Sequence, residues 1–152
     1  MKEIEKECTR VEKYKVYQAT DGTEFINYEE CKKYEDSALG VVRGNITKLI
    51  AGRADDAWDL MGGNDDNSVI AIRMYCAADV DLVKQLFLLE HPYYNKDESK
   101  ELKQKKFDII DTAYNKGDVV LFGINCEGDY YFINSRQNII DNLNNLTEKK
   151  DA

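Results

Sequence analysis

Alternating apolar and polar residues predict strands near both ends of the chain. The run Tyr14–Ala19 alternates large apolar with polar side chains, which is typical of a strand with one buried face. Asp21-Gly22 follows it and forms a strong two-residue hairpin turn, because both residues tolerate positive φ. A second short strand is expected at 23–26. A similar strand is predicted at Tyr130–Ile133, after a turn at 127–129.

The tripeptide Phe-Ile-Asn closes both of these strand segments. Asn27 with Glu30, and Asn134 with Gln137, have the spacing of a capping box, in which the Asn oxygen accepts an amide hydrogen bond and the N3 side chain reaches back. We therefore expect two strand–turn–strand–helix units, one near each end. A duplication and a chance likeness of two common local structures both fit this pattern.

Two further segments have the composition of buried strands. In Val69–Cys76 every second residue is apolar, and Val119–Ile124 is almost continuously apolar. A strand of the second kind is covered on both faces and lies centrally in its sheet. We expect Ile72 and Phe122 to be nearly fully buried on neighbouring positions of one sheet.

Apolar residues at helical spacing predict the remaining elements. Helices are expected from Tyr28, over Ile46–Met61, from a cap at Asp79 to a stop before Pro92, over Ser99–Asn115 and after Asn134.

Gly40 and Gly44 lie four residues apart and so share one helical face. In one interpretation they break the segment into two helices, with Asn45 capping the second, because each glycine costs a helix about 1 kcal/mol. In the other they leave a flat strip where another element approaches closely.

Together these elements predict the α+β class: one domain over 1–152, with a sheet of about five largely antiparallel strands, two hairpin–helix units and packed helices. Residues 1–10 and 148–152 are expected to be frayed tails. The 152 residues, 43% hydrophobic and 33% charged, suit a folded domain with a substantial core.

The net charge of −8 argues against nucleic-acid binding, which depends on lysine and arginine, so no direct binding of this kind is expected. No apolar run approaches the length of a membrane span, and the charged first residues lack a secretion signal. We therefore expect a cytoplasmic protein without membrane contact. The four cysteines are widely spaced and form no CxxC pair, so most are expected to be buried, reduced thiols.

The chain offers little for catalysis. His91 is the only histidine, and any Ser-His-Asp or Cys-His triad must use it. It lies beside Pro92 at a predicted helix end, where the helix dipole stabilises a positive imidazole. GxSxG and phosphate-binding glycine patterns are absent, and the cysteines lack the local pairing of a zinc site. We expect no metal, no cofactor and no enzyme.

Negative charge is most concentrated between Arg53 and Arg73, where no lysine or arginine interrupts five aspartates. These are Asp55, Asp56, Asp59, Asp65 and Asp66. Three interpretations remain: ordinary solvated surface, a divalent-cation site of carboxylate oxygens without EF-hand spacing, and an anionic surface that docks a basic partner.

Ten tyrosines include the adjacent pairs Tyr93-Tyr94 and Tyr130-Tyr131. Adjacent strand residues point to opposite faces, so one of the second pair is either exposed or covered by a helix. Exposed tyrosines are favoured at protein interfaces. Tyr93, Tyr94 and Tyr130 therefore join the five aspartates as candidate partner-binding residues.

The sequence YKVYQATDGTEF at 14–25, followed by YEECKKYE at 28–35, resembles the opening of small accessory proteins encoded by bacteriophages and other mobile elements. The resemblance implies a small protein in the cytoplasm of the bacterial host, where it binds a host protein, host defence nucleases included. It carries over no catalytic residue.

Two functional hypotheses follow. The first is a non-enzymatic protein-binding module, in its more specific form an inhibitor of a host CRISPR or restriction nuclease, whose basic channel an acidic domain can occupy. The alternative is a small-ligand or nucleotide binder that sequesters a signal. A flat acidic face with tyrosines favours the first, and a deep arginine-lined cavity the second. The candidate donors for such a cavity are Arg43, Arg53, Arg73 and Arg136.

Overall fold

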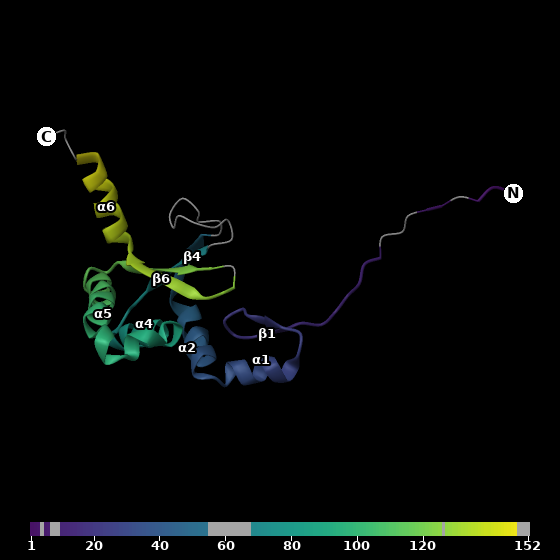
Figure 1. The fold of residues 1–152 in the computed structure, drawn as a ribbon, viewed down its shortest axis with the longest axis horizontal. Helices are drawn as coiled ribbons and strands as arrows, with labels where there is room; N and C mark the ends of the chain where they lie inside the picture. The colour runs from purple at the N-terminus through teal and green to yellow at the C-terminus, as the bar shows by residue number, and fades with distance from the viewer. Residues whose placement is uncertain (4, 7–9, 55–67, 126, 149–152) are drawn as a thin grey trace.

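After an extended N-terminal segment, the chain forms a small hairpin–helix unit that lies beside the rest of the fold (Figure 1). The computed structural model describes residues 1–152 except 4, 7–9, 55–67, 126 and 149–152. Strand β1 (Tyr17–Gln18) pairs antiparallel with β2 (Glu24–Phe25), and α1 (Tyr28–Glu35) follows. These three elements are called the N-terminal unit below.

The hairpin turn and the Asn27 cap of the N-terminal unit form as predicted, but each strand covers only two residues, fewer than the predicted Tyr14–Ala19 and 23–26. Gly22 takes a φ of 93° in the hairpin turn, a conformation that glycine adopts at little cost. Asn27 is the N-cap of α1, and its side-chain oxygen accepts a hydrogen bond of 2.8 Å from the Glu29 amide. The first Phe-Ile-Asn segment therefore ends in the expected helix cap.

The second Phe-Ile-Asn segment differs by one residue. It lies in β6 (Tyr130–Ser135), and α6 (Arg136–Glu148) begins directly after that strand. Ser135 Oγ accepts from the Asn138 amide at 3.0 Å, whereas the Asn134 side chain reaches only the Ser135 amide. The prediction of an Asn134 cap is thus wrong, because the strand runs one residue further and a serine can cap equally well.

The main sheet has four antiparallel strands in the order β3-β4-β5-β6. They are β3 (Ile50–Ala54), β4 (Ser68–Arg73), β5 (Val119–Ile124) and β6. The α+β class and the antiparallel pairing are confirmed. The expected single sheet of about five strands is wrong, since the strands form two sheets, one of two strands and one of four.

The sequence pattern predicted a helix where the structure has a short turn and strand β3. Helix α2 spans Ala38–Ile46, a 3-10 turn η1 covers Thr47–Leu49, and β3 follows where a helix over Ile46–Met61 was predicted. Glycine at position 52 is unfavourable in a helix, whereas β3 gains a ladder of hydrogen bonds with the apolar strand β4. The rest of that predicted helix, 55–61, lies outside the described residues.

The later helices follow the predictions closely. Helix α4 spans Ala77–Glu90, η2 Pro92–Asn95, η3 Asp97–Ser99 and α5 Lys100–Asn115. The N-cap of α4 is Cys76 rather than Asp79. Asp79 sits at N3, where its carboxylate accepts from the amides of Tyr75 and Cys76 at 2.8 and 3.2 Å.

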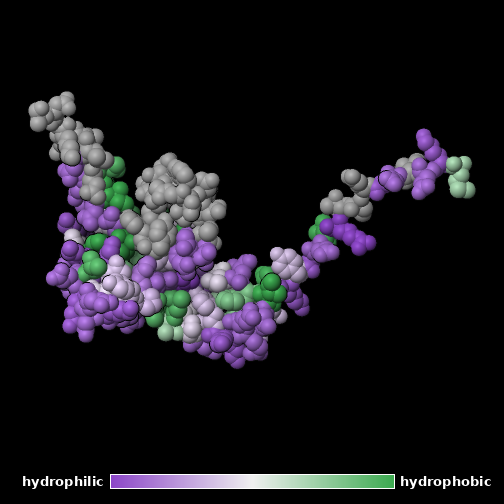
Figure 2. All heavy atoms as spheres, viewed as in Figure 1, coloured by the Kyte–Doolittle hydropathy of each residue, from purple (hydrophilic) through white to green (hydrophobic). Residues whose placement is uncertain are grey.

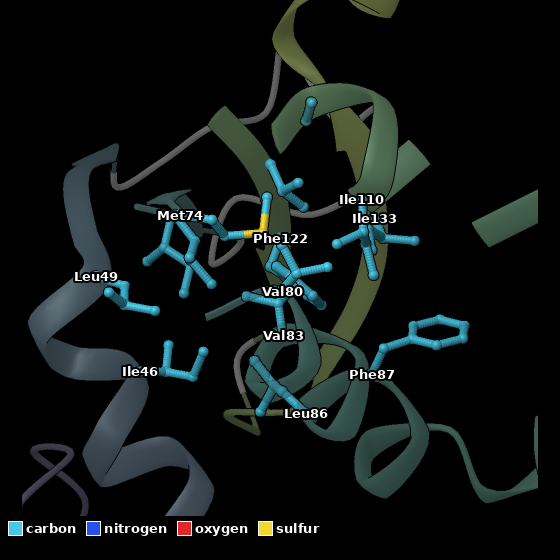
Figure 3. Close-up of a cluster of buried hydrophobic side chains, with 14 of the residues drawn as sticks. Ile46, Leu49, Met74, Val80, Val83, Leu86, Phe87, Ile110, Phe122 and Ile133 are labelled. Atoms are coloured by element: carbon cyan, nitrogen blue, oxygen red, sulfur yellow. The ribbon is translucent and has the colours of Figure 1, made fainter. Parts of the chain in front are cut away.

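One face of the main sheet and the helices α2, α4 and α5 enclose the core (Figure 3). Ile72 and Phe122 are both 0% exposed, as predicted, and Phe122 pairs with Ile70 across β4 and β5. Figure 3 shows Ile46 and Leu49 approaching this cluster from one side and Val83 and Leu86 from α4. The core thus fixes the positions from which α2 and α4 carry the polar residues described next.

Candidate functional site

Arg43 connects three separate parts of the chain. It lies on α2 next to the buried Val42, and its own side chain is largely buried. Its Nε donates to Glu90 Oε1 at 2.6 Å, at the end of α4. Its Nη2 donates to the Gly128 carbonyl at 3.0 Å, in the turn before β6, and its Nη1 donates to the Tyr34 hydroxyl at 3.2 Å.

The contacts of Arg43 continue into the N-terminal hairpin. The Tyr34 hydroxyl, on α1, donates to Asp21 Oδ2 at 2.6 Å. The other carboxylate oxygen of Asp21 accepts from the Thr23 amide at 3.0 Å and so holds the hairpin turn. A continuous hydrogen-bonded path therefore runs from the hairpin turn to the end of α4. We call its residues, together with Tyr130, the Arg43 cluster: Asp21, Tyr34, Arg43, Glu90 and Tyr130.

Tyr130 supplies the aromatic part of the cluster. The Arg43 guanidinium carbon lies 4.6 Å from the centroid of the Tyr130 ring, in the range of a cation–π contact. The same ring packs against Phe122 of the core at 5.9 Å. Burial raises the pKa of Tyr130 to about 12, so its hydroxyl stays neutral across the physiological range.

The charges of the cluster are largely removed from water. The Arg43 side chain is 11% exposed and that of Glu90 is 5% exposed. Burial raises the pKa of Glu90, and the attraction of Arg43 opposes that shift. Every buried side-chain nitrogen and oxygen in the described part of the chain has a hydrogen-bond partner. The buried polar groups of the cluster therefore all have partners, and these contacts attach the N-terminal unit to α2 and α4.

His91 adjoins the cluster and caps α4 at its C-terminus. Its ring packs 5.2 Å from Phe87 and 6.2 Å from Tyr94. Burial lowers the pKa of His91. Burial thus opposes the positive charge that a helix C-terminus favours.

Gly40 and Gly44 provide a second contact between α2 and the N-terminal unit, where the two parts of the chain pack closely. A Cβ on Gly40 would lie 2.0 Å from the Tyr34 carbonyl oxygen, and one on Gly44 would lie 3.5 Å from the Thr20 side chain. Both glycines are inside α2, whose N-cap is Ser37. The interpretation of a break with an Asn45 cap is thus wrong, and the close-approach interpretation is correct.

The predicted partner-binding residues do not form one surface in the described part of the chain. Asp55, Asp56, Asp59, Asp65 and Asp66 lie outside the described residues. Tyr93 is 50% exposed on η2, while Tyr94 is half-buried against Phe87 at 4.9 Å. Tyr130 is half-buried beneath Arg43.

The four arginines proposed as ligand donors each have a protein partner. Besides Arg43, these are Arg53 with Ser68, Arg73 with the Gly117 carbonyl at 2.9 Å, and Arg136 with Asp118 at 2.8 Å. Two shallow hollows, of about 520 and 320 Å³, are both lined largely by α1 and α2 surface residues and are open to solvent. Neither contains an arginine, so they give the ligand-binding alternative no support.

The cysteine and acidic side chains of the described residues form no metal site. Cys31 is buried and Cys76 is exposed, both as free thiols, while Cys8 and Cys126 lie outside the described residues. No group of three or more His, Cys, Asp or Glu side chains within the described ranges is placed to hold a metal ion.

A group of exposed residues that the sequence analysis missed lies on the N-terminal hairpin, its flanks and the first turn of α1. Tyr17 packs on Tyr28 at 5.5 Å and Phe25 on Tyr34 at 5.3 Å, so this side of the hairpin faces α1. Strand alternation then turns Val16 and Ile26 away from α1.

Four large side chains on the hairpin and its flanks are exposed: Tyr14 by 80%, Val16 by 42%, Ile26 by 80% and Tyr28 by 54%. Figure 2 shows apolar colour where the extended N-terminal residues enter the hairpin. Three acidic residues beside them, Glu24, Glu29 and Glu30, are also exposed. We call these seven residues the hairpin surface.

Comparison with known proteins assigns no family. No protein-family model matches the chain, and the searches of curated proteins and of solved structures also gave no match. None of the helices in the described ranges is long and apolar enough to cross a membrane.

Proposed function

We propose that this protein is a non-enzymatic protein-binding module that presents its hairpin surface to a basic surface of a partner protein. The observation that carries the proposal is the Arg43 cluster, which fixes the N-terminal unit to the folded body while leaving the outer face of the hairpin exposed. A rigidly held surface loses less conformational entropy on binding than a mobile one.

The composition of the hairpin surface supports a protein partner. Aromatic and apolar side chains are enriched at the centres of protein interfaces, and charged residues form the rim. Ile26 and Tyr28 are exposed and are followed in the sequence by the exposed Glu29 and Glu30. Residues 14–36, which contain the whole hairpin surface, carry six acidic and three basic side chains. Such a surface is complementary to a basic one.

The partner class follows from this charge and from the likeness of residues 14–35 to phage and mobile-element accessory proteins. We propose a host protein that handles nucleic acid, such as a CRISPR or restriction nuclease, because its substrate channel is basic. Occupying that channel would inhibit the enzyme without any chemistry by this chain. The alternative, sequestration of a small ligand, finds less support, because the candidate arginines already bind protein groups.

The test is capture of partners from a bacterial host lysate by the immobilised full chain, followed by measurement of Kd for a captured protein. Replacing both Ile26 and Tyr28 by alanine should weaken binding roughly thirtyfold, which corresponds to about 2 kcal/mol for an interface hot spot. Tyr75, 71% exposed before α4, gives the control Tyr75→Ala, which should bind like wild type.

Salt dependence tests the charge component. Affinity should fall between 0.1 and 1 M salt, since the Debye length shrinks from about 10 Å to about 3 Å. A variant with Asp55, Asp59 and Asp65 changed to Asn separates the hairpin surface from the five aspartates of the sequence analysis. Equal binding by wild type and the Ile26/Tyr28 variant would refute the hairpin surface as the docking site, and capture of no partner would refute the proposed function.

A further inference from the structure

The N-terminal unit, which spans residues 17–35, has a small core of its own. Each of its two aromatic pairs joins the hairpin to α1. Thr20 adds polar contacts between the same parts, because its amide and its hydroxyl donate to Glu35 Oε1 at 2.9 and 2.8 Å. Figure 1 shows the hairpin and α1 lying against each other, apart from the main sheet. The unit therefore holds together mainly through contacts within itself.

The body of the fold, from α2 onward, has a separate core. In the described part of the chain, the core cluster and the partly buried apolar side chains around it begin at Leu39 and include no residue of the N-terminal unit. Helix α2 also has its own N-cap, since Ser37 Oγ accepts from the Gly40 amide at 3.0 Å and both residues follow α1. The body therefore keeps its core and the cap of its first helix when the N-terminal unit is detached.

The N-terminal unit is too small to stay folded by itself. Strands β1 and β2 have two residues each, and α1 has eight. A single two-stranded hairpin is marginally stable in water, and so is an isolated helix of fewer than about 12 residues. Folding of the unit thus depends on its attachment to the body.

The attachment centres on the Tyr34 hydroxyl. This oxygen accepts from Arg43 Nη1 at 3.2 Å and donates to Asp21 Oδ2 at 2.6 Å, so it bonds the body and the hairpin turn at once. The Thr20 side chain lies beside Gly44 of α2 and adds a packing contact. Loss of the Tyr34 hydroxyl therefore weakens the docking of the unit and the contact between its hairpin and its helix together.

We propose that the N-terminal unit is an order–disorder element: it is folded while the Tyr34 hydroxyl bonds Arg43, and it unfolds on release while the body remains native. Proteins open locally in such cooperative units, at a lower free energy than global unfolding. The docked form is the major one in the free chain. Because an unfolded unit presents no hairpin surface, a partner that needs this surface binds only the docked fraction of the molecules. That consequence rests on the proposed function, whereas the element itself is measured on the free chain, so its test and the capture of a partner fail independently.

Hydrogen exchange of the purified full chain, followed by mass spectrometry of its peptides, tests the proposal. Amides of residues 17–35 should exchange through a common opening, faster than those of β5. Tyr34→Phe should speed exchange of residues 17–35 about tenfold, the factor that corresponds to the roughly 1.4 kcal/mol of a hydrogen bond. Tyr17→Phe removes a hydroxyl of the same unit that is outside the Arg43 cluster, and this control should exchange like wild type. Alkylation of Cys31, which is 6% exposed, gives a second measure of the same opening.

Two truncations in the body separate a local opening from global unfolding. Val83→Ala and Ile110→Val each shorten a side chain that is 0% exposed, so amides of β5 should exchange at least severalfold faster. Because the body stays folded when the unit opens, exchange of residues 17–35 should not change. Equal acceleration of both regions would overturn the proposal, since the unit would then unfold only with the rest of the chain. Exchange of residues 17–35 as slow as that of β5, or Tyr34→Phe exchanging no faster than Tyr17→Phe, would also overturn it.

Discussion

Arg43 and Glu90 stand 47 residues apart in the chain, yet Arg43 Nε lies 2.6 Å from Glu90 Oε1 and little of either side chain reaches solvent. The pair joins α2 to the end of α4, and through Tyr34 it also reaches the hairpin turn. Because the guanidinium binds three different groups at once, its loss affects the N-terminal unit, α4 and the turn before β6 together.

Replacing Arg43 by alanine should lower the free energy of unfolding by about 3–5 kcal/mol, the cost of leaving one charge of a buried pair without its partner. Arg43→Lys should recover only part of this loss, because an ammonium cannot reproduce the planar fork that reaches Glu90, Gly128 and Tyr34. Urea unfolding measures both values. In a double-mutant cycle, Glu90→Gln should cost less in the Arg43→Ala background than in wild type. Additive effects would contradict direct coupling of the pair.

The sequence predicted elements whose signals are local. Asp21-Gly22 forms the hairpin turn, Asn27 caps α1, and the apolar run Val119–Ile124 is the central strand β5. Each of these depends on a few neighbouring residues and on the physical preferences of those residues alone. The one-residue error at Asn134 has the same origin, since Asn134 and Ser135 are both good caps and only the length of β6 decides between them.

The site could not be predicted in the same way, because its contacts are long-range. Arg43 is the one charged residue of α2 and Glu90 follows the apolar run Leu86–Leu89 at the end of α4, and these two positions were the available signal. Nothing in either segment says that the two meet. Strand β3 was missed for a similar reason, since it pairs with residues of β4 that lie 15 to 22 positions further along the chain, and helical periodicity does not reveal this pairing.

Phe122 gives the clearest test of the core. It is 0% exposed on β5 and packs against Tyr130 at 5.9 Å, so truncation leaves a cavity that also removes support from the Arg43 cluster. Phe122→Ala should lower the free energy of unfolding by about 3–5 kcal/mol. Tyr75→Ala, at a position 71% exposed, is the control and should change stability by no more than about 0.5 kcal/mol. An unchanged melting temperature for Phe122→Ala would show that β5 is not central.

Two glycines of one helix should respond oppositely to the same substitution. Alanine raises the helix propensity of α2 by about 1 kcal/mol at either position. At Gly44 the new methyl makes an ordinary contact of 3.5 Å with Thr20, so Gly44→Ala should stabilise the protein by up to that amount.

At Gly40 the methyl would lie 2.0 Å from the Tyr34 carbonyl oxygen, a backbone atom. Gly40→Ala should therefore destabilise the protein by about 1–3 kcal/mol in spite of the propensity gain. Thermal unfolding of both variants gives the signs. Equal stabilisation by the two alanines would mean that α1 does not approach α2 as closely as described.

His91 should make stability depend on pH between about 7.5 and 5.5. Burial lowers its pKa below the ordinary 6.5, so His91 binds a proton more weakly in the folded chain than in the unfolded chain. The contribution of neutral His91 is thus fully present above pH 6.5 and is lost as the pH falls toward the folded pKa. Glu90, whose pKa is raised by burial, acts in the opposite direction, because protonation in the folded state favours folding as the pH falls.

The variant His91→Gln isolates the contribution of the histidine. The stability that wild type loses relative to this variant should grow as the pH drops from 7.5 to 5.5. Since His91 is the only histidine, its imidazole proton resonance gives the pKa directly. A value at or above 6.5, or parallel pH profiles for the two proteins, would show that the aromatic packing around His91 does not exclude its charge.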